Sequence, residues 1–317
     1  MYSVRQIISG LNNPSKILRE IEKYSGKIQN KLLGCNFMLE DWDNLIILDA
    51  CRYDMFKQMN TIEGKLEWRR SKGSATWEFS QNNFSDREYF DIVYVNANPR
   101  VSLVTEDTFH YQHDVWQNAW DSDQGTVMPN TMVQQTLEME RKYPKKRIVA
   151  HFLQPHHPFL GQTALAELRD LSGNTGARNE ALNDNEQTGS GPDERDHIWA
   201  KLEKGEIELD IIREAYYESL QETLPYVDFL CSKLKGKTVV TSDHGNLLGE
   251  QSHPRLPWKT QRFAHPDHAT AKVLVKVPWL VCPFDSRKFS IPETPEKRRS
   301  VYNEDSLEQK LESLGYK

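Results

Sequence analysis

The chain has 317 residues and a formal net charge of −6, from 40 lysines and arginines against 46 aspartates and glutamates. This length suits one large domain or two ordinary ones. The acidic balance offers no electrostatic basis for wrapping a polyanion, so nucleic acid is excluded as an expected partner. The four cysteines form no Cys-x-x-Cys pair, which argues against a zinc knuckle and a disulfide scaffold and favours a reducing, cytoplasmic location.

Residues 1–40 predict a helical extension ahead of a main domain at 41–317. The N-terminus lacks the apolar core of a signal peptide, and no run reaches the ~18 uninterrupted apolar residues of a membrane span. Apolar residues nevertheless lie among basic ones here: Ile7, Ile8 and Leu11 among Arg5, Lys16, Arg19, Lys23 and Lys27. Peripheral contact with a membrane surface and a plain docking helix both fit this pattern.

Five short apolar runs rich in β-branched residues each predict a strand buried on both faces. They are Asn44–Ala50, Asp91–Ala97, Arg147–Gln154, Lys237–Asp243 and Val277–Cys282. Helical patterns at Thr131–Tyr143 and Ala215–Leu234 separate several of these runs. The alternation predicts an α/β fold, a three-layer α/β/α sandwich around a mostly parallel central sheet.

A polar segment interrupts this pattern within about residues 165–200. Its centre, Leu171–Asp196, is rich in Gly, Asn, Asp and Glu and has almost no apolar periodicity, which predicts an exposed insertion. A lid over a site and a plain surface loop are both compatible with this composition.

Acidic and imidazole side chains accumulate where the predicted strands end. Asp49 ends the first strand and is followed by Arg52, while Asp243 and His244 end the fourth. His156 and His157 follow the third strand, and His265 and His268 precede the last. A parallel sheet gathers the carboxyl ends of its strands at one edge, where ligands bind. Carboxylate oxygen and imidazole nitrogen are ligands of Zn²⁺ and Mn²⁺, so the pattern predicts a metal site.

The block TSDHGN, followed in order by LGE, AHP and VPWL, resembles the carboxyl half of the alkaline phosphatase superfamily. That superfamily includes sulfatases, phosphoethanolamine transferases, lipoteichoic acid synthases and cofactor-independent phosphoglycerate mutases. The resemblance implies that Asp49, Asp243 and His244 bind a divalent metal. It places the nucleophile, which is also a metal ligand, in the stretch SKGSATWEF, where Thr76 best matches the threonine of the transferases and Ser74 is the alternative.

The resemblance also implies roles for the histidines. His156 in HHPF is similar to the motif that contacts substrate in the transferases and is preferred over its neighbour His157. His265 matches a late histidine that binds a second metal or the anionic group of the substrate. No Asp-x-x-x-His pair like that of alkaline phosphatase directly follows a predicted strand, which favours a one-metal site or one completed by histidines. The expected cofactor is one or two divalent ions, with zinc or manganese ahead of calcium.

These features predict a metal-dependent hydrolase or transferase that uses Thr76 as its nucleophile. The expected substrate is a phosphate or sulfate ester, carried on a glycan or a lipid. Phosphoesters are favoured because the Cys-x-Pro-x-Arg signature of formylglycine sulfatases is missing. Arg52 is expected to pair with the ester oxygens, while His156 and His265 protonate the leaving group or contact the transferred group.

Simpler interpretations remain open for each residue. Asp49 could cap a helix, Thr76 could occupy a turn, and Arg52 could pair with Asp54 or Glu78. The alternative function is a catalytically degenerate, sulfatase-like subunit that binds or scaffolds in a glycan or lipid pathway.

Overall fold

The computed structural model of the protein describes residues 14–85, 87–105, 107–168, 178, 197–253 and 262–295. The predicted insertion at Leu171–Asp196 lies outside these residues, apart from Arg178. The N-terminal residues Arg5, Ile7, Ile8 and Leu11 lie outside them as well. The predictions made for these two segments therefore stay predictions.

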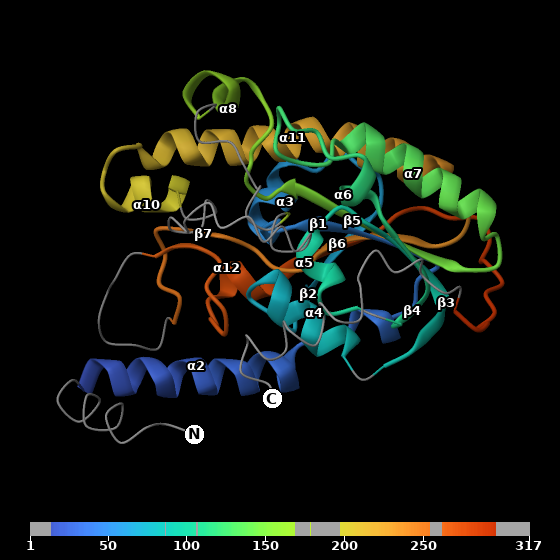
Figure 1. Cartoon of the computed structure of the whole chain (residues 1–317), viewed down its shortest axis with the longest axis horizontal. Helices are drawn as coiled ribbons and strands as arrows, with labels where there is room; N and C mark the ends of the chain where they lie inside the picture. Colours follow the sequence, from blue (N-terminus) through green and yellow to red (C-terminus); the bar gives the residue numbers. More distant parts are fainter. Residues whose placement is uncertain are drawn as a thin grey trace, which may run out of the picture.

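Seven strands form the central sheet in the order β2, β9, β6, β1, β5, β3, β4 (Figure 1). β1 pairs in parallel with β5 and β6, and β3 pairs in parallel with β4 and β5, whereas β9 runs antiparallel to β2 and β6. The strands are β1 Asn44–Asp49, β2 Lys65–Arg70, β3 Tyr89–Asn96, β4 Phe109–Asp114, β5 Arg147–Pro155, β6 Thr238–Ser242 and β9 Lys276–Val281. A separate antiparallel pair is formed by β7 Leu247–Leu248 and β8 Phe263–Ala264.

Helices cover both faces of this sheet (Figure 1). The long helices α7 and α11 pack against β5 on one face, whereas α4 and the 3-10 helix η1 contribute to the core on the other. The helices are α2 Pro14–Leu33, η1 Phe37–Leu39, α3 Tyr53–Met59, α4 Thr76–Phe84, α5 Pro99–Ser102, α6 Val115–Asn118, α7 Pro129–Lys142, α8 Gln162–Glu167, α10 His197–Glu203, α11 Leu209–Lys233 and α12 Lys272–Val275. The predicted α/β/α sandwich with a mostly parallel sheet is confirmed.

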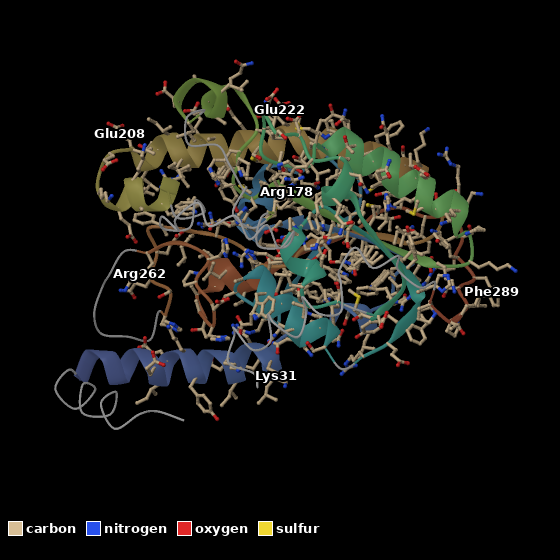
Figure 2. All side chains as sticks on the ribbon, viewed as in Figure 1. Lys31, Arg178, Glu208, Glu222, Arg262 and Phe289 are labelled. Atoms are coloured by element: carbon tan, nitrogen blue, oxygen red, sulfur yellow. The ribbon has the colours of Figure 1, made fainter. Side chains whose placement is uncertain are left out.

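Alternation along the strands explains why the sheet is buried on both faces. In β1, Ile46 and Leu48 belong to the core beneath α7 and α11, while Leu45 and Ile47 point into the opposite core with Phe79 of α4. Side chains fill the space between the layers (Figure 2). Each of the five inner strands of the sheet therefore reads as a continuous apolar run, which is the pattern that predicted β1, β3, β5, β6 and β9.

Two strands at the sheet edges escape this pattern. β2 carries the charged sequence KLEWRR, and its side chains are exposed or only half-buried because the strand has β9 as a neighbour on one side alone. β4, at the other edge, carries the polar sequence FHYQHD. An edge strand need not bury both faces, so the composition of β2 does not identify it as a strand. Most of β4 is buried, but its polar residues hide it as well.

The helix α2 packs against the rest of the chain through two residues on one face. A Cβ at Gly26 would lie 1.8 Å from the carbonyl oxygen of His268, so the glycine permits a close backbone contact. The buried Asn30 donates hydrogen bonds to both carboxylate oxygens of Glu78, at 3.3 Å each, and to the carbonyl of Ala269 at 3.1 Å. Among the described residues, no helix is both long enough and apolar enough to cross a bilayer. The domain boundary at residue 40 stays a prediction.

Replacing Asn30 by leucine is expected to lower the free energy of unfolding by about 1–3 kcal/mol, because it leaves the buried Glu78 carboxylate short of a donor. Urea unfolding measures the loss. Ser25→Ala, on the exposed face of the same helix, is the matched control and should change stability by about 0.5 kcal/mol or less. Equal losses in the two variants would show that the Asn30 contacts do not anchor α2.

Candidate metal and active site

The register of β1 and β6 brings two aspartates together at one edge of the sheet. Leu48 pairs with Ser242 in parallel, so the residues that follow them, Asp49 and Asp243, emerge side by side. The turn after β1 places Ala50 at φ 58°, and its N–H donates to Asp243 Oδ1 at 3.0 Å. The side chain of Asp243 is therefore held by the backbone of the neighbouring strand.

Thr76, the first residue of α4, reaches the same point. Its Oγ1 lies 2.9 Å from Asp243 Oδ2 and 3.2 Å from His244 Nε2. His244 Nε2 in turn lies 3.4 Å from Asp243 Oδ2 and 3.6 Å from Asp49 Oδ1. All four side chains are buried. The structure thus brings together the residues that the sequence predicted as nucleophile and first metal ligands.

The donor set fits a cation better than a hydrogen-bond network. His244 Nδ1 lies 2.7 Å from the carbonyl oxygen of Gly245, which only accepts, so in the neutral ring the proton resides on Nδ1 and Nε2 presents a lone pair to the carboxylates. Asp49 Oδ1 is buried and has no hydrogen-bond partner among the described residues. Burial, followed by the negative charge of Asp243, raises the pKa of Asp49 well above its usual range. A divalent ion would satisfy these atoms together.

His151 adds an imidazole that the sequence analysis missed. It lies in the middle of β5, and its ring, Asp49 and Asp243 offer ligand atoms within 4.8 Å of one another. Its Nδ1 is 2.8 Å from the hydroxyl of Tyr94, while its buried Nε2 finds no partner in the described part of the chain. Burial lowers the pKa of His151 to about 4, so the ring is neutral and able to bind a metal. A histidine inside an apolar strand was the available signal.

His156 and His265 form a second imidazole group beside the first. Their Nε2 atoms are 2.9 Å apart, and the ring of His265 lies 4.5 Å from the ring of His244, centroid to centroid. Burial lowers the pKa of His156 to about 4, and burial followed by the charge of His244 lowers the pKa of His265 well below its usual value. His265 Nδ1 is buried and lacks a partner among the residues described. This neutral pair is suited to donating or accepting hydrogen bonds.

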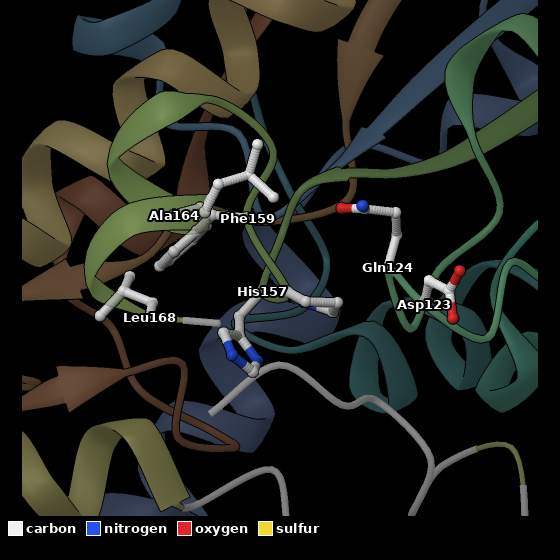
Figure 3. Close-up of a pocket in the computed structure, with 8 residues that line it drawn as sticks. Asp123, Gln124, His157, Phe159, Ala164 and Leu168 are labelled. Carbon is white, nitrogen blue, oxygen red and sulfur yellow. The ribbon is translucent and has the colours of Figure 1, made fainter. Parts of the chain in front are cut away.

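His157 points elsewhere than its neighbour. Its ring packs edge-on against Phe159, with ring centroids 5.5 Å apart. Figure 3 shows it at a small hollow that also includes Ala164, Leu168, Asp123 and Gln124. Its backbone segment also borders the larger cavity described next. The preference for His156 over His157 as the substrate contact stays a prediction; His156 is the one of the two for which a contact with His265 is seen.

A cavity of about 530 Å³ lies beside Asp49 and Thr76, which line it. Its lining also includes Asn98, the N-cap residue of α5, and Arg100 in that helix. Asn98 Nδ2 donates to Asp49 Oδ2, which orients that carboxylate. The other lining residues are Ala75, Trp77, Leu153, His156, His157, Trp199, Ala200, Glu203, Phe263, Ala264, His265, Pro266 and Asp267. Arg100 and Asn98 were also missed, although NPR directly follows a predicted strand.

Arg52 occupies a different position. Its guanidinium pairs with Asp54 at 2.6 Å and with Glu250 at 2.7 Å, and it donates to the carbonyl of Asn246 at 3.2 Å. Among the described residues, those that line the cavity include Arg100 and not Arg52. The pairing of Arg52 with Asp54 matches the simpler of its two predicted roles, and its contact with substrate stays a prediction.

Comparisons with known proteins yield structural relatives only. The chain matches no family model and no curated protein. It is similar to the C-terminal periplasmic domain of EcEptC from Escherichia coli, with a TM-score of 0.41, 12% identity, and coverage of 80% of this chain and 76% of that one. The complex of that domain with Zn has a TM-score of 0.37 and 12% identity, and the match covers 81% of this chain and 77% of that one. A protein in the alkaline phosphatase superfamily from Vibrio parahaemolyticus has a TM-score of 0.38 and 10% identity, and the match covers 88% of this chain and 71% of that one. That superfamily is the one that the motifs resemble.

Proposed function

We propose that the chain is a metal-dependent enzyme that cleaves or transfers a phosphate or sulfate ester through Thr76. The observation that carries this proposal is the meeting of Thr76 Oγ1 with Asp243 and His244, next to a buried Asp49 oxygen that lacks a partner in the described chain. A hydroxyl held between a carboxylate and an imidazole is the arrangement of an activated nucleophile. Thr76 also lines the cavity, where a substrate could reach its hydroxyl.

Asp49, Asp243 and His244 would hold the metal, with His151 as a further ligand from below. Mixed oxygen and nitrogen ligands suit Zn²⁺ or Mn²⁺ better than Ca²⁺, which takes oxygen ligands. When bound, such an ion neutralises negative charge on the ester and lowers the pKa of a nearby hydroxyl. His265 and His156 are the residues that would complete a second site if two ions bind.

The residues of the chain then divide the reaction among themselves. Thr76 Oγ1 attacks the phosphorus or sulfur centre and its proton passes to Asp243 Oδ2, 2.9 Å away, while the bond to the leaving oxygen breaks and that oxygen takes a proton from water. Arg100 pairs with the remaining oxygens of the anionic centre, and His156 and His265 line the cavity beside them. Water or an alcohol next displaces the group from Thr76. The identity of that acceptor separates a hydrolase from a transferase.

A panel of chromogenic esters tests this proposal. The protein, dialysed against chelator and reloaded with Zn²⁺ or Mn²⁺, is expected to hydrolyse 4-nitrophenyl phosphate or its diester faster than 4-nitrophenyl sulfate, and Asp243→Asn is expected to abolish the turnover. Saturable binding of a glycan or lipid without turnover of any ester, unchanged in Asp243→Asn, would support the non-catalytic binding subunit instead.

Exchange of the two arginines for methionine should separate their roles. Arg100→Met is expected to lower kcat/KM per folded molecule by roughly 10- to 100-fold, because a charged hydrogen bond to the substrate is lost. Arg52→Met is expected to lower the melting temperature, because it leaves Glu250 and Asp54 without their cation. If kcat/KM per folded molecule falls further in Arg52→Met than in Arg100→Met, the assignment is reversed.

A further inference from the structure

The helix α2 presents an apolar stripe to solvent. Ile21, Tyr24, Ile28 and Leu32 are exposed to 58%, 69%, 42% and 74%. Their spacing of three and four residues puts them on one face of the helix, opposite the face on which Gly26 and Asn30 are buried. A helix needs only one buried face to dock, so the packing of α2 against the protein does not account for this second apolar face.

Basic residues accompany the stripe. Lys23, Lys27 and Lys31 are exposed on α2, and Lys31 is visible at the end of the helix in Figure 2. Beyond that end, burial followed by the positive charges of Arg87 and Lys31 lowers the pKa of Lys72. These cations gather at one helix although the whole chain carries a formal charge of −6. The charge of this region is therefore opposite to that of the molecule.

We propose that α2 is a docking surface for an anionic phospholipid bilayer, with Ile21, Tyr24, Ile28 and Leu32 inserted among the acyl chains and the lysines paired with headgroup phosphates. An apolar stripe edged with lysines is the pattern of helices that lie in the membrane interface. A second copy of the chain fits less well, because two stripes in contact would bring two sets of lysines together. Anionic headgroups instead attract them.

The placement of α2 links this surface to the cavity. Gly26 and Asn30 contact His268 and Ala269, which directly follow the cavity-lining residues Pro266 and Asp267. A bilayer bound to α2 therefore holds one wall of the cavity near the lipid headgroups. This placement, together with the proposed function on which this step rests, favours an ester carried on a membrane lipid as the substrate. The docking itself requires no catalytic activity.

Vesicle flotation tests the proposal on the full chain. The protein is expected to float with vesicles of phosphatidylcholine and phosphatidylglycerol and to bind pure phosphatidylcholine more weakly, with the difference shrinking at high salt. The double variant Ile28→Asp, Leu32→Asp should bind about tenfold more weakly or worse. Lys27→Gln and Lys31→Gln should each weaken binding about fivefold. Phe289→Asp, which removes an equally exposed apolar side chain at a distant point of the molecule (Figure 2), should leave binding unchanged.

Three results would overturn the proposal. The first is that the double variant floats with the vesicles as well as the Phe289→Asp control does, or that the wild type does not float with them at all. The second is a dimer by light scattering that the double variant dissociates, which would make a second copy the occupant. The third is a marked fall in the melting temperature of the double variant, which would show that the chain covers its own stripe. Metal content and turnover of a soluble ester, measured in parallel, should stay at the wild-type level, so a failure of docking is distinguishable from a failure of the proposed catalysis.

Discussion

Replacement of Thr76 by alanine is expected to lower ester turnover by roughly 10³- to 10⁶-fold while the protein stays folded. The loss is large because Oγ1 is the atom proposed to attack, and it lies within hydrogen-bond distance of Asp243 and His244. The helix that Thr76 begins does not depend on it, since its N-cap residue is Ala75. Single-turnover kinetics with the zinc-loaded or manganese-loaded protein measure the effect, and circular dichroism monitors the fold. Thr76→Ser should recover part of the rate.

Ser74 supplies the matched control for this experiment. Its Oγ lies 2.8 Å from the carbonyl of Pro266, 3.1 Å from Glu78 Oε2 and 3.0 Å from the N–H of Ala269, so it ties α4 to the loop beneath it. Ser74→Ala is expected to cost about 1 kcal/mol of stability and to retain turnover in the folded fraction. The reverse outcome, with turnover lost in Ser74→Ala and kept in Thr76→Ala, would make Ser74 the nucleophile.

Asp49→Asn is expected to remove most of the stabilisation that a bound metal confers. At a free zinc concentration of 100 to 1,000 times the dissociation constant, metal binding should raise the wild-type free energy of unfolding by about 2.7–4.1 kcal/mol over the chelated protein. The variant should lose this increment, because Asp49 Oδ1 is a proposed ligand. Without metal the variant should be more stable than the wild type, since the buried Asp49 no longer repels Asp243. Urea unfolding with zinc and with chelator measures both quantities.

Asp114→Asn is the matched control for that comparison. Asp114 is another buried carboxylate at the carboxyl end of a strand, but its partners are the neutral side chains of Asn96, Ser102 and Gln112. It should lower stability equally with and without zinc, because it takes no part in the proposed site. An undiminished zinc increment in Asp49→Asn would remove Asp49 from the ligand set.

The fold was largely predictable because its central strands are buried on both faces. A run such as NLIILDA is too short for a typical buried helix and has the length of a buried strand. It matches β1 to within a residue. The edge strands β2 and β4 were not predictable in this way, since one side of each meets solvent or loops and their residues are mostly polar or charged. The domain boundary at residue 40 and the insertion at 165–200 remain predictions.

The site was predictable where it depends on strand ends. Asp49 and Asp243 meet because adjacent parallel strands end at the same edge, a rule that applies before any coordinates are known. His151 was not predictable, because its contribution depends on the register of β5 against β1 and on the Tyr94 hydroxyl that holds its ring. Arg100 was overlooked for Arg52 because both come soon after a strand, and only the packing around Glu250 shows that the Arg52 guanidinium is engaged in an internal ion pair.

The metal content per chain shows directly whether Asp49, Asp243 and His244 bind a divalent ion. Wild type and Asp243→Ala are dialysed against chelator, reloaded with Zn²⁺, Mn²⁺ or Ca²⁺, and analysed for bound metal after removal of the excess. We expect at least one tightly bound zinc or manganese ion in the wild type and one fewer in the variant, with circular dichroism showing both folded. A wild type that retains no metal under any loading, or a variant that retains as much as the wild type, would contradict it.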